Sequence, residues 1–162
     1  MSLREQIAKT ARAWLKAHRD RNPDAIRALV APDFIANFHP KSLPPQGNKD
    51  GEGYVQFSAQ AFTLFETYSP TEVDLVVDEG PRKAVCYVEA RGYKELTIGC
   101  GTGTAAAPGV NDGYSNQYIH KLTLTEDGRL VKVFDSFVDS AAMMVFMGKV
   151  FAAKSGVSQP SE

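Results

Sequence analysis

The chain has little of what several classes of protein require. Its 162 residues include only two cysteines, Cys86 and Cys100, which form no disulfide framework, although a single bridge between them stays open. No apolar run approaches the length of a membrane span, and the charged N-terminus lacks the apolar segment of a signal peptide. We therefore expect a cytoplasmic protein that does not bind membranes.

An excess of charge of one sign is also missing. The 18 lysines and arginines nearly balance the 19 aspartates and glutamates, which gives a net charge of -1. This balance does not predict binding to nucleic acid. The glycine-rich segment 99–103 matches neither the GxGxxG pattern nor a Walker motif with its lysine, so we expect no phosphate-binding loop.

What the sequence does contain is helical periodicity in its first third. Ser2 with Glu5 fits a capping box, and apolar residues then recur at helical spacing. Asn22 before Pro23 predicts the start of a second helix. An aromatic stripe predicts a third helix over residues 52–68.

Strand patterns follow. A short strand is expected at 33–39, paired strands at 73–77 and 84–96, and a long hairpin at 113–140 that turns at 126–128. Ser140 would cap a final helix over 141–151. We expect a mobile loop at 99–113, one domain over 1–155 and a disordered tail over 156–162.

Helices followed by a meander of strands predict an α+β fold. The expected architecture is a cone-shaped, curved antiparallel sheet packed against three N-terminal helices, with a short C-terminal helix. Such a sheet encloses one deep cavity between its curved face and the helices. A small-molecule pocket is therefore expected there.

The first hairpin strand places hydrogen-bonding side chains on one face, because side chains alternate along a strand. This face carries Tyr114, Asn116, Tyr118, His120 and Leu122. A four-residue turn, 125–128, would set Val133, Asp135 and Phe137 opposite His120, Tyr118 and Asn116. A three-residue turn would bring in Phe134 and Ser136 instead. We prefer the four-residue turn.

Several motifs together resemble a known family. They are Trp14, Asp33-Phe34 leading to Phe38-His39-Pro40, the segment 114–118, the turn 126–130 and Phe137-Val138-Asp139-Ser140. With these motifs the chain resembles the SnoaL-like and ketosteroid-isomerase-like branch of the nuclear-transport-factor-2-like superfamily. Within it, the chain is similar to fungal proteins of polyketide and meroterpenoid pathways.

The resemblance implies at which positions catalytic residues would stand, although the residue types at these positions differ from those of the family. Ketosteroid isomerases have a tyrosine on the first helix, an aspartate at the end of the short strand and a protonated aspartate on the hairpin. By motif these places fall at Trp14, His39 and His120. The resemblance also implies a homodimer formed through the outer sheet face, near Gln117, Ile119 and Thr123.

Two histidines suit proton abstraction beside a carbonyl group. His39 would act as general base, and His120, held by Asp135, would stabilise the developing oxyanion. Tyr118 would relay a proton. Alternatively, His39 bonds a backbone carbonyl, and His120 is a wall residue bonded to Tyr118 or water. These two histidines with Asp135 lack the local spacing of a metal site, so we expect neither metal nor cofactor.

The remaining candidates would hold the substrate. They are Trp14, Tyr54, Phe57, Phe62, Asn116 and Phe137. Trp14 also suits core packing, and Asp139 suits the start of the last helix. The expected function is a cofactor-independent isomerase, cyclase or dehydratase that acts on a small polyketide- or terpenoid-derived carbonyl compound. The alternatives are a non-catalytic module that binds a small ligand or a protein, and a relative that has lost its activity.

Overall fold

The computed structural model describes residues 1–41, 47–63, 67–80, 82–93 and 114–154. Two predicted segments, the loop at 99–113 and the tail at 156–162, lie outside the described residues. Cys100 also lies outside them, so the possible bridge between Cys86 and Cys100 is not tested. Among the described helices, none combines the length and the apolar character needed to cross a membrane.

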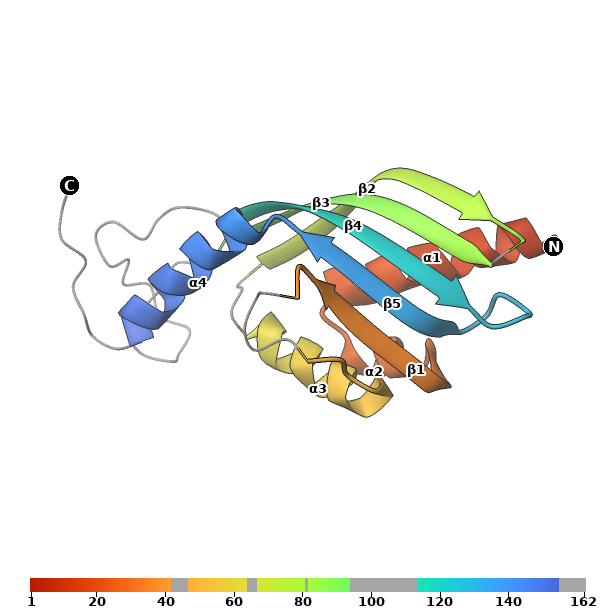
Figure 1. Ribbon diagram of the computed structural model, residues 1–162, viewed down its shortest axis with the longest axis horizontal. Coiled ribbons are helices and arrows are strands. Elements are labelled where there is room, and N and C mark those ends of the chain that lie inside the picture. The colour runs from red at the N-terminus through yellow and green to blue at the C-terminus, as the bar shows by residue number, and fades with distance from the viewer. Residues whose placement is uncertain (42–46, 64–66, 81, 94–113, 155–162) are drawn as a thin grey trace.

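One curved sheet of five strands forms the centre of the fold (Figure 1). Its strands lie in the order β1-β5-β4-β3-β2, with bounds β1 Val30–His39, β2 Thr67–Asp78, β3 Lys83–Tyr93, β4 Tyr114–Leu124 and β5 Val131–Val138. This confirms the predicted curved sheet with one correction, because β1 pairs with β5 in parallel. The long connection through α3 and the β2–β4 meander lets the two strands run the same way.

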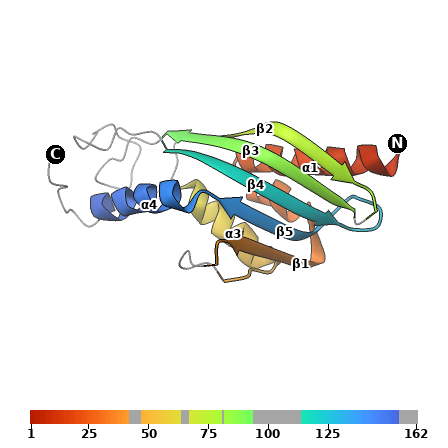
Figure 2. The same ribbon diagram turned by 45° about the horizontal axis from the view of Figure 1, so that its top comes forward.

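Three helices cover one face of the sheet, as predicted, and the fourth extends past its end (Figure 2). They are α1 Leu3–Arg19, α2 Pro23–Arg27, α3 Gly51–Phe62 and α4 Ser140–Lys154. We call the covered face the inner face and the opposite one the outer face. The fold class is therefore α+β, with helices on one side of an open, curved sheet.

The predicted starts of α1 and α2 are confirmed. The Ser2 hydroxyl accepts the Glu5 N–H at 3.2 Å, while the Ser2 N–H donates to the Glu5 carboxylate at 2.7 Å. The Asn22 side chain accepts the Ala25 N–H at 3.0 Å. Local sequence signals thus fix both helix starts.

Two other helix ends differ from prediction. α3 ends at Phe62 rather than near Tyr68, because Thr67 and Tyr68 belong to β2 and pair with β3 just before Pro70. α4 is capped by Asp139, whose carboxylate accepts the Ala141 and Ala142 N–H groups at 2.9 and 3.3 Å. The cap is therefore Asp139 and not Ser140.

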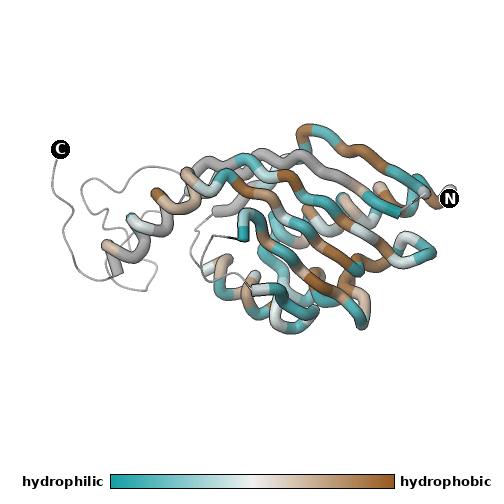
Figure 3. Tube along the Cα trace, viewed as in Figure 1, coloured by the Kyte–Doolittle hydropathy of each residue, from teal (hydrophilic) through white to brown (hydrophobic). Residues whose placement is uncertain are grey.

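The preferred hairpin register is wrong. His120 pairs with Ser136, Leu122 with Phe134 and Tyr118 with Val138. The turn closes between Thr125 and Leu130, where the Thr125 N–H donates to the Leu130 carbonyl at 2.9 Å, and the register shifts beside Leu124. This register buries Phe134 and Ser136 and leaves Phe137 exposed. Figure 3 shows hydrophobic and hydrophilic residues alternating along the strands.

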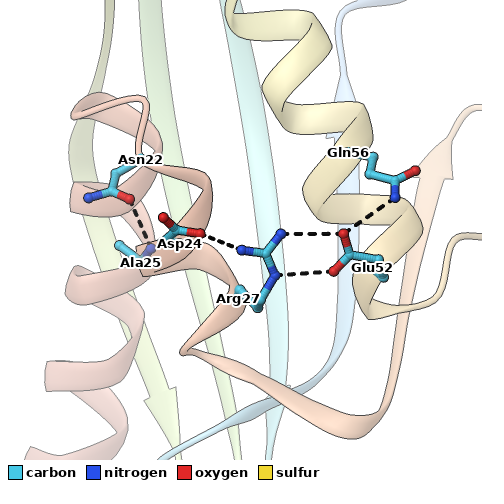
Figure 4. A network of polar contacts seen from close by, with 6 residues as sticks. All are labelled: Asn22, Asp24, Ala25, Arg27, Glu52 and Gln56. Atoms are coloured by element: carbon cyan, nitrogen blue, oxygen red, sulfur yellow. Dashed lines mark hydrogen bonds and ion pairs between the residues drawn. The ribbon is translucent and has the colours of Figure 1, made fainter.

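Polar contacts hold α3 beside α2 (Figure 4). The Arg27 guanidinium donates to the Glu52 carboxylate through Nε at 3.1 Å and through Nη2 at 3.3 Å, and it also pairs with Asp24. Gln56 donates to Glu52 one turn along α3. These groups are exposed, so solvent screens each pair and its contribution to stability is small. They tie the first turn of α3, the helix that carries Tyr54, to α2.

Candidate active site on the inner face

A group of rings from four elements meets on the inner face. We call the following five residues the inner cluster: Trp14 and His18 of α1, Tyr54 of α3, His120 of β4 and Phe134 of β5. Trp14 stacks on Tyr54 with ring centroids 5.5 Å apart and an interplanar angle of 11°. Phe134 lies 5.2 Å from Trp14 and 5.0 Å from His120, centroid to centroid. All five are buried.

Two nitrogen atoms of this cluster, Trp14 Nε1 and His120 Nδ1, have no hydrogen-bond partner among the residues that the structure describes. Trp14 is fully buried and His120 is 6% exposed. Buried polar atoms are nearly always paired, so an unpaired one marks a place for a ligand group or an ordered water. Two such atoms on rings that contact the same Phe134 indicate a polar site within an aromatic wall.

The third polar ring, His18, is bonded at both nitrogens. Its Nδ1 lies 2.7 Å from the Trp14 carbonyl oxygen, and its Nε2 lies 2.8 Å from the Tyr54 hydroxyl. The carbonyl belongs to the residue one turn earlier on α1, so the helix itself fixes the imidazole ring.

Burial keeps both imidazoles neutral. It lowers the pKa of His18 to about 4, although the hydrogen bond to the Trp14 carbonyl acts in the opposite direction. Burial lowers the pKa of His120 to about 3, and the nearby His18 lowers it further. At neutral pH each ring therefore has one N–H and one lone pair. Neutral imidazoles can donate a hydrogen bond to an oxygen that gains negative charge.

The prediction that His39 and His120 face one another is wrong. His39 lies on the outer face, where its ring stacks on Phe137 at 4.4 Å and its Nε2 lies 3.6 Å from Asp135. Asp135 also pairs with Lys121 at 3.3 Å and accepts from Asn37 at 2.9 Å. The observed register turns Asp135 and Phe137 outward and brings Phe134 and Ser136 inward.

Other predicted site residues do lie on the inner side. Tyr118 is buried with its ring 5.5 Å from that of His120, and Tyr54 is part of the inner cluster. Phe57 and Phe62 are partly buried and pack against the core. The side chain of Asn116 lies outside the described part of the structure; its backbone pairs with Ala90. Their roles in binding or catalysis stay predictions.

Sequence reasoning missed His18 as a functional candidate. Because it follows Trp14 by four residues on the apolar stripe of α1, the helical spacing predicted only that its side chain is buried. The available signal was an ionisable side chain on an otherwise apolar helix face. Among the described residues, no group of three or more histidines, cysteines or carboxylates is arranged to hold a metal ion.

Comparisons with known proteins agree with this fold. No protein-family model matches the chain. Austinoid biosynthesis clusters protein H of Penicillium brasilianum is 24% identical over 157 residues, which cover 93% of this chain and 97% of that protein. Such proteins confirm the predicted likeness to fungal pathway proteins.

Solved structures show the same architecture. The BvnE pinacolase from Penicillium brevicompactum superposes with a TM-score of 0.78 at 22% identity, covering 94% of this chain and 99% of its own. A protein described as a SnoaL-like polyketide cyclase from Jannaschia sp. CCS1 has a TM-score of 0.68 at 16% identity, with 99% and 97% coverage. The chain therefore has the SnoaL-like fold.

Proposed function

We propose that this SnoaL-like protein is a cofactor-independent isomerase, cyclase or dehydratase. It would act in the cytoplasm on a small polyketide- or terpenoid-derived carbonyl compound. One observation carries the proposal: Trp14 Nε1 and His120 Nδ1 are buried in one aromatic cluster, and neither has a hydrogen-bond partner within the described part of the chain. The names of similar proteins, a pinacolase and a polyketide cyclase, support an isomerase- or cyclase-type reaction.

The inner cluster would stabilise an enolate. Trp14 Nε1–H can only donate, and neutral His120 can donate through Nδ1, so both would bind the carbonyl oxygen. Their hydrogen bonds strengthen as that oxygen gains charge, which lowers the barrier to removing the neighbouring proton. Tyr118, beside His120, would relay that proton to the enolate oxygen, so the carbon–hydrogen bond that breaks is balanced by a new oxygen–hydrogen bond and the product is the neutral enol. This places the reaction on the inner face, away from His39.

The test uses α-tetralone, a bicyclic ketone, as a probe. Transfer of its α-protons to D2O, followed by NMR, reports enolisation directly. We expect the protein to accelerate the exchange and His120→Ala to slow it by roughly a hundredfold. The exposed Lys9→Ala variant serves as a control for handling and folding. Unchanged exchange in a folded His120→Ala protein would reject the proposal.

His39→Ala decides between the two faces in the same assay. An inner-face reaction predicts that the exchange rate stays within about twofold, because His39 lies across the sheet from the inner cluster. A hundredfold loss would return the general-base role to His39 and its neighbour Asp135.

A non-catalytic binding role is the second candidate. One observation favours it, since pKa values of about 4 and 3 make His18 and His120 weak bases at neutral pH. A binding module would take up α-tetralone without accelerating its exchange. Calorimetry beside the exchange assay separates the two functions.

We also propose a homodimer formed through the outer face. Exposed apolar side chains gather there, among them Ile35, Ile119 and Phe137, beside a depression of about 250 Å³ that Gln117 and Asp139 also line. Burial of such a surface favours association. Sedimentation analysis should give a dimer that Ile119→Lys dissociates; a monomeric wild type would reject it.

A further inference from the structure

The register of the β4–β5 hairpin sets two polar side chains opposite one another on the inner face. His120 pairs with Ser136, and directly opposed residues of antiparallel strands have Cβ atoms about 4.5–5.5 Å apart. Both residues are buried, whereas their neighbours along the strands, Lys121 and Asp135, pair on the outer face. The Ser136 hydroxyl therefore belongs to the same wall as the His120 imidazole.

These two polar groups do not bond to one another. Among the described residues, none forms a hydrogen bond with the Ser136 hydroxyl, and none does so with His120 Nδ1. The other imidazole of the inner cluster, His18, uses both of its nitrogens on the Trp14 carbonyl and the Tyr54 hydroxyl. Ser136 and His120 are therefore both free to bond to one further atom.

The wall is not sealed at this pair. His120 and Ser136 keep exposed fractions of 6% and 5%, so a water-sized molecule still reaches each residue. Buried polar groups that the protein leaves unpaired are usually paired with an ordered water or a ligand atom. A hydroxyl and a neutral imidazole can each donate, so an oxygen atom placed between them accepts two hydrogen bonds.

We infer that Ser136 is a further donor to the carbonyl oxygen that His120 and Trp14 bind. Ser136 approaches this oxygen from β5 and His120 from β4, so two paired strands hold the donors at a fixed spacing. Ser136 keeps its proton, and the carbon–hydrogen bond that breaks is still balanced by the proton that Tyr118 relays. The inference rests on the proposed function and adds one catalytic residue to it.

A purely structural role for Ser136 is the alternative to be tested. Its partner on β1 is Phe38, whose ring packs on Phe57 at 5.1 Å, so a small side chain also makes room for rings. Ser136→Ala separates the two roles, because alanine keeps the small size and lacks the hydroxyl. Thr10→Val is the matched control, since it removes a buried hydroxyl that donates to the Gly128 carbonyl at 2.7 Å.

The exchange assay with α-tetralone measures the catalytic effect. Ser136→Ala should slow the exchange roughly tenfold or more, the effect of one lost hydrogen bond to a developing charge. Thr10→Val should lower stability and leave the exchange of the folded protein within about twofold. Cys86, the partner of His120 on β3, has its side chain outside the described residues, and a thiol is a weak donor. A loss in Cys86→Ala with none in Ser136→Ala would overturn the inference.

A spectroscopic probe reports the donor directly. The anion of 4-nitrophenol resembles an enolate and absorbs visible light, whereas 4-nitroanisole has the same ring without the acidic hydroxyl. Donors that converge on the phenolate oxygen favour the anion, so removing one should raise the pKa of bound 4-nitrophenol by about one unit in Ser136→Ala. The affinity for 4-nitroanisole, measured by calorimetry, should change by less than about twofold.

Three results of this titration would overturn the role of Ser136. They are an unchanged pKa of bound 4-nitrophenol in folded Ser136→Ala, an equal loss of affinity for both probes, and no binding of 4-nitrophenol by the wild-type protein. An equal loss is what a structural defect predicts, because such a defect does not distinguish the anion from the ether.

The two proposals can fail separately. If His120→Ala slows the exchange of α-tetralone and Ser136→Ala does not, the role of Ser136 alone is rejected. If the protein does not accelerate the exchange, but Ser136→Ala raises the pKa of bound 4-nitrophenol, the enzyme alone is rejected and Ser136 stays a donor to the ligand.

Discussion

Acid should destabilise this protein well above the pH at which carboxyl groups titrate. Folding lowers the pKa of His18 from 6.5 to about 4 and that of His120 from 6.5 to about 3. The unfolded chain therefore binds protons that the folded protein excludes. Above pH 6.5 the native state has its full stability, and it loses stability as the pH falls toward the folded pKa values.

The size of the loss follows from these values. Between pH 8 and pH 5, each buried histidine should lower the free energy of unfolding by about 2 kcal/mol, or roughly 4 kcal/mol for the pair. Carboxyl groups contribute little in this window, because their unfolded pKa values lie near 4. Since small domains unfold with about 5–15 kcal/mol, the loss is a large share of the total.

Urea unfolding followed by circular dichroism at pH 8 and pH 5 measures this difference. His120→Leu should reduce it to roughly 2 kcal/mol, because only His18 then contributes in the folded core. Each protein is compared with itself at two pH values, so a general effect of the substitution on stability cancels. A wild-type difference below about 1 kcal/mol would refute the view that both imidazoles are buried and neutral.

Two further predictions concern the turn and the last helix. Gly128 has a φ of 69°, and an added Cβ would lie 3.1 Å from Ile7, so Gly128→Ala should lower the free energy of unfolding in urea by about 1–3 kcal/mol. The control Gly80→Ala, where an added Cβ makes only ordinary contacts, should lower it by less than about 0.5 kcal/mol. Equal effects of the two substitutions would contradict this account. Asp139→Ala should remove the cap of α4 and lower the free energy of unfolding by about 1 kcal/mol. Ser140→Ala should change the same free energy by less than about 0.5 kcal/mol. The reverse order of the two effects would identify Ser140 as the cap.

The sequence predicted what depends on near neighbours. The caps at Ser2 and Asn22 and the position of the turn near Gly128 are set by neighbouring residues, so their patterns were sufficient for these features, although the length of the turn was not predicted. The face shared by Tyr118, His120 and Leu122 was also correct, because the period of two needs only a strand. The fold class followed from the order of these elements.

The rest depended on distant parts of the chain. A register shift beside Leu124 and the longer turn changed which residues of β5 face inward, so Asp135 and Phe137 moved to the outer face. His39 was placed by family position, and only its pairing with Phe137 in parallel β5 shows which way it points. The bond between His18 and the Tyr54 hydroxyl could not be predicted from local sequence, because the two residues lie 36 positions apart.

The two faces of the sheet differ in the charges that they can hold. The outer face carries ionisable groups that pair with one another, His39 and Lys121 with Asp135, where solvent lowers the cost of their charge. The inner face carries two neutral imidazoles, an indole and a phenol, because an unpaired charge buried there would cost several kcal/mol. A reaction on the inner face must therefore proceed through directed neutral hydrogen bonds rather than ion pairs. Enolate stabilisation by fixed neutral donors is the chemistry that such a face supports best.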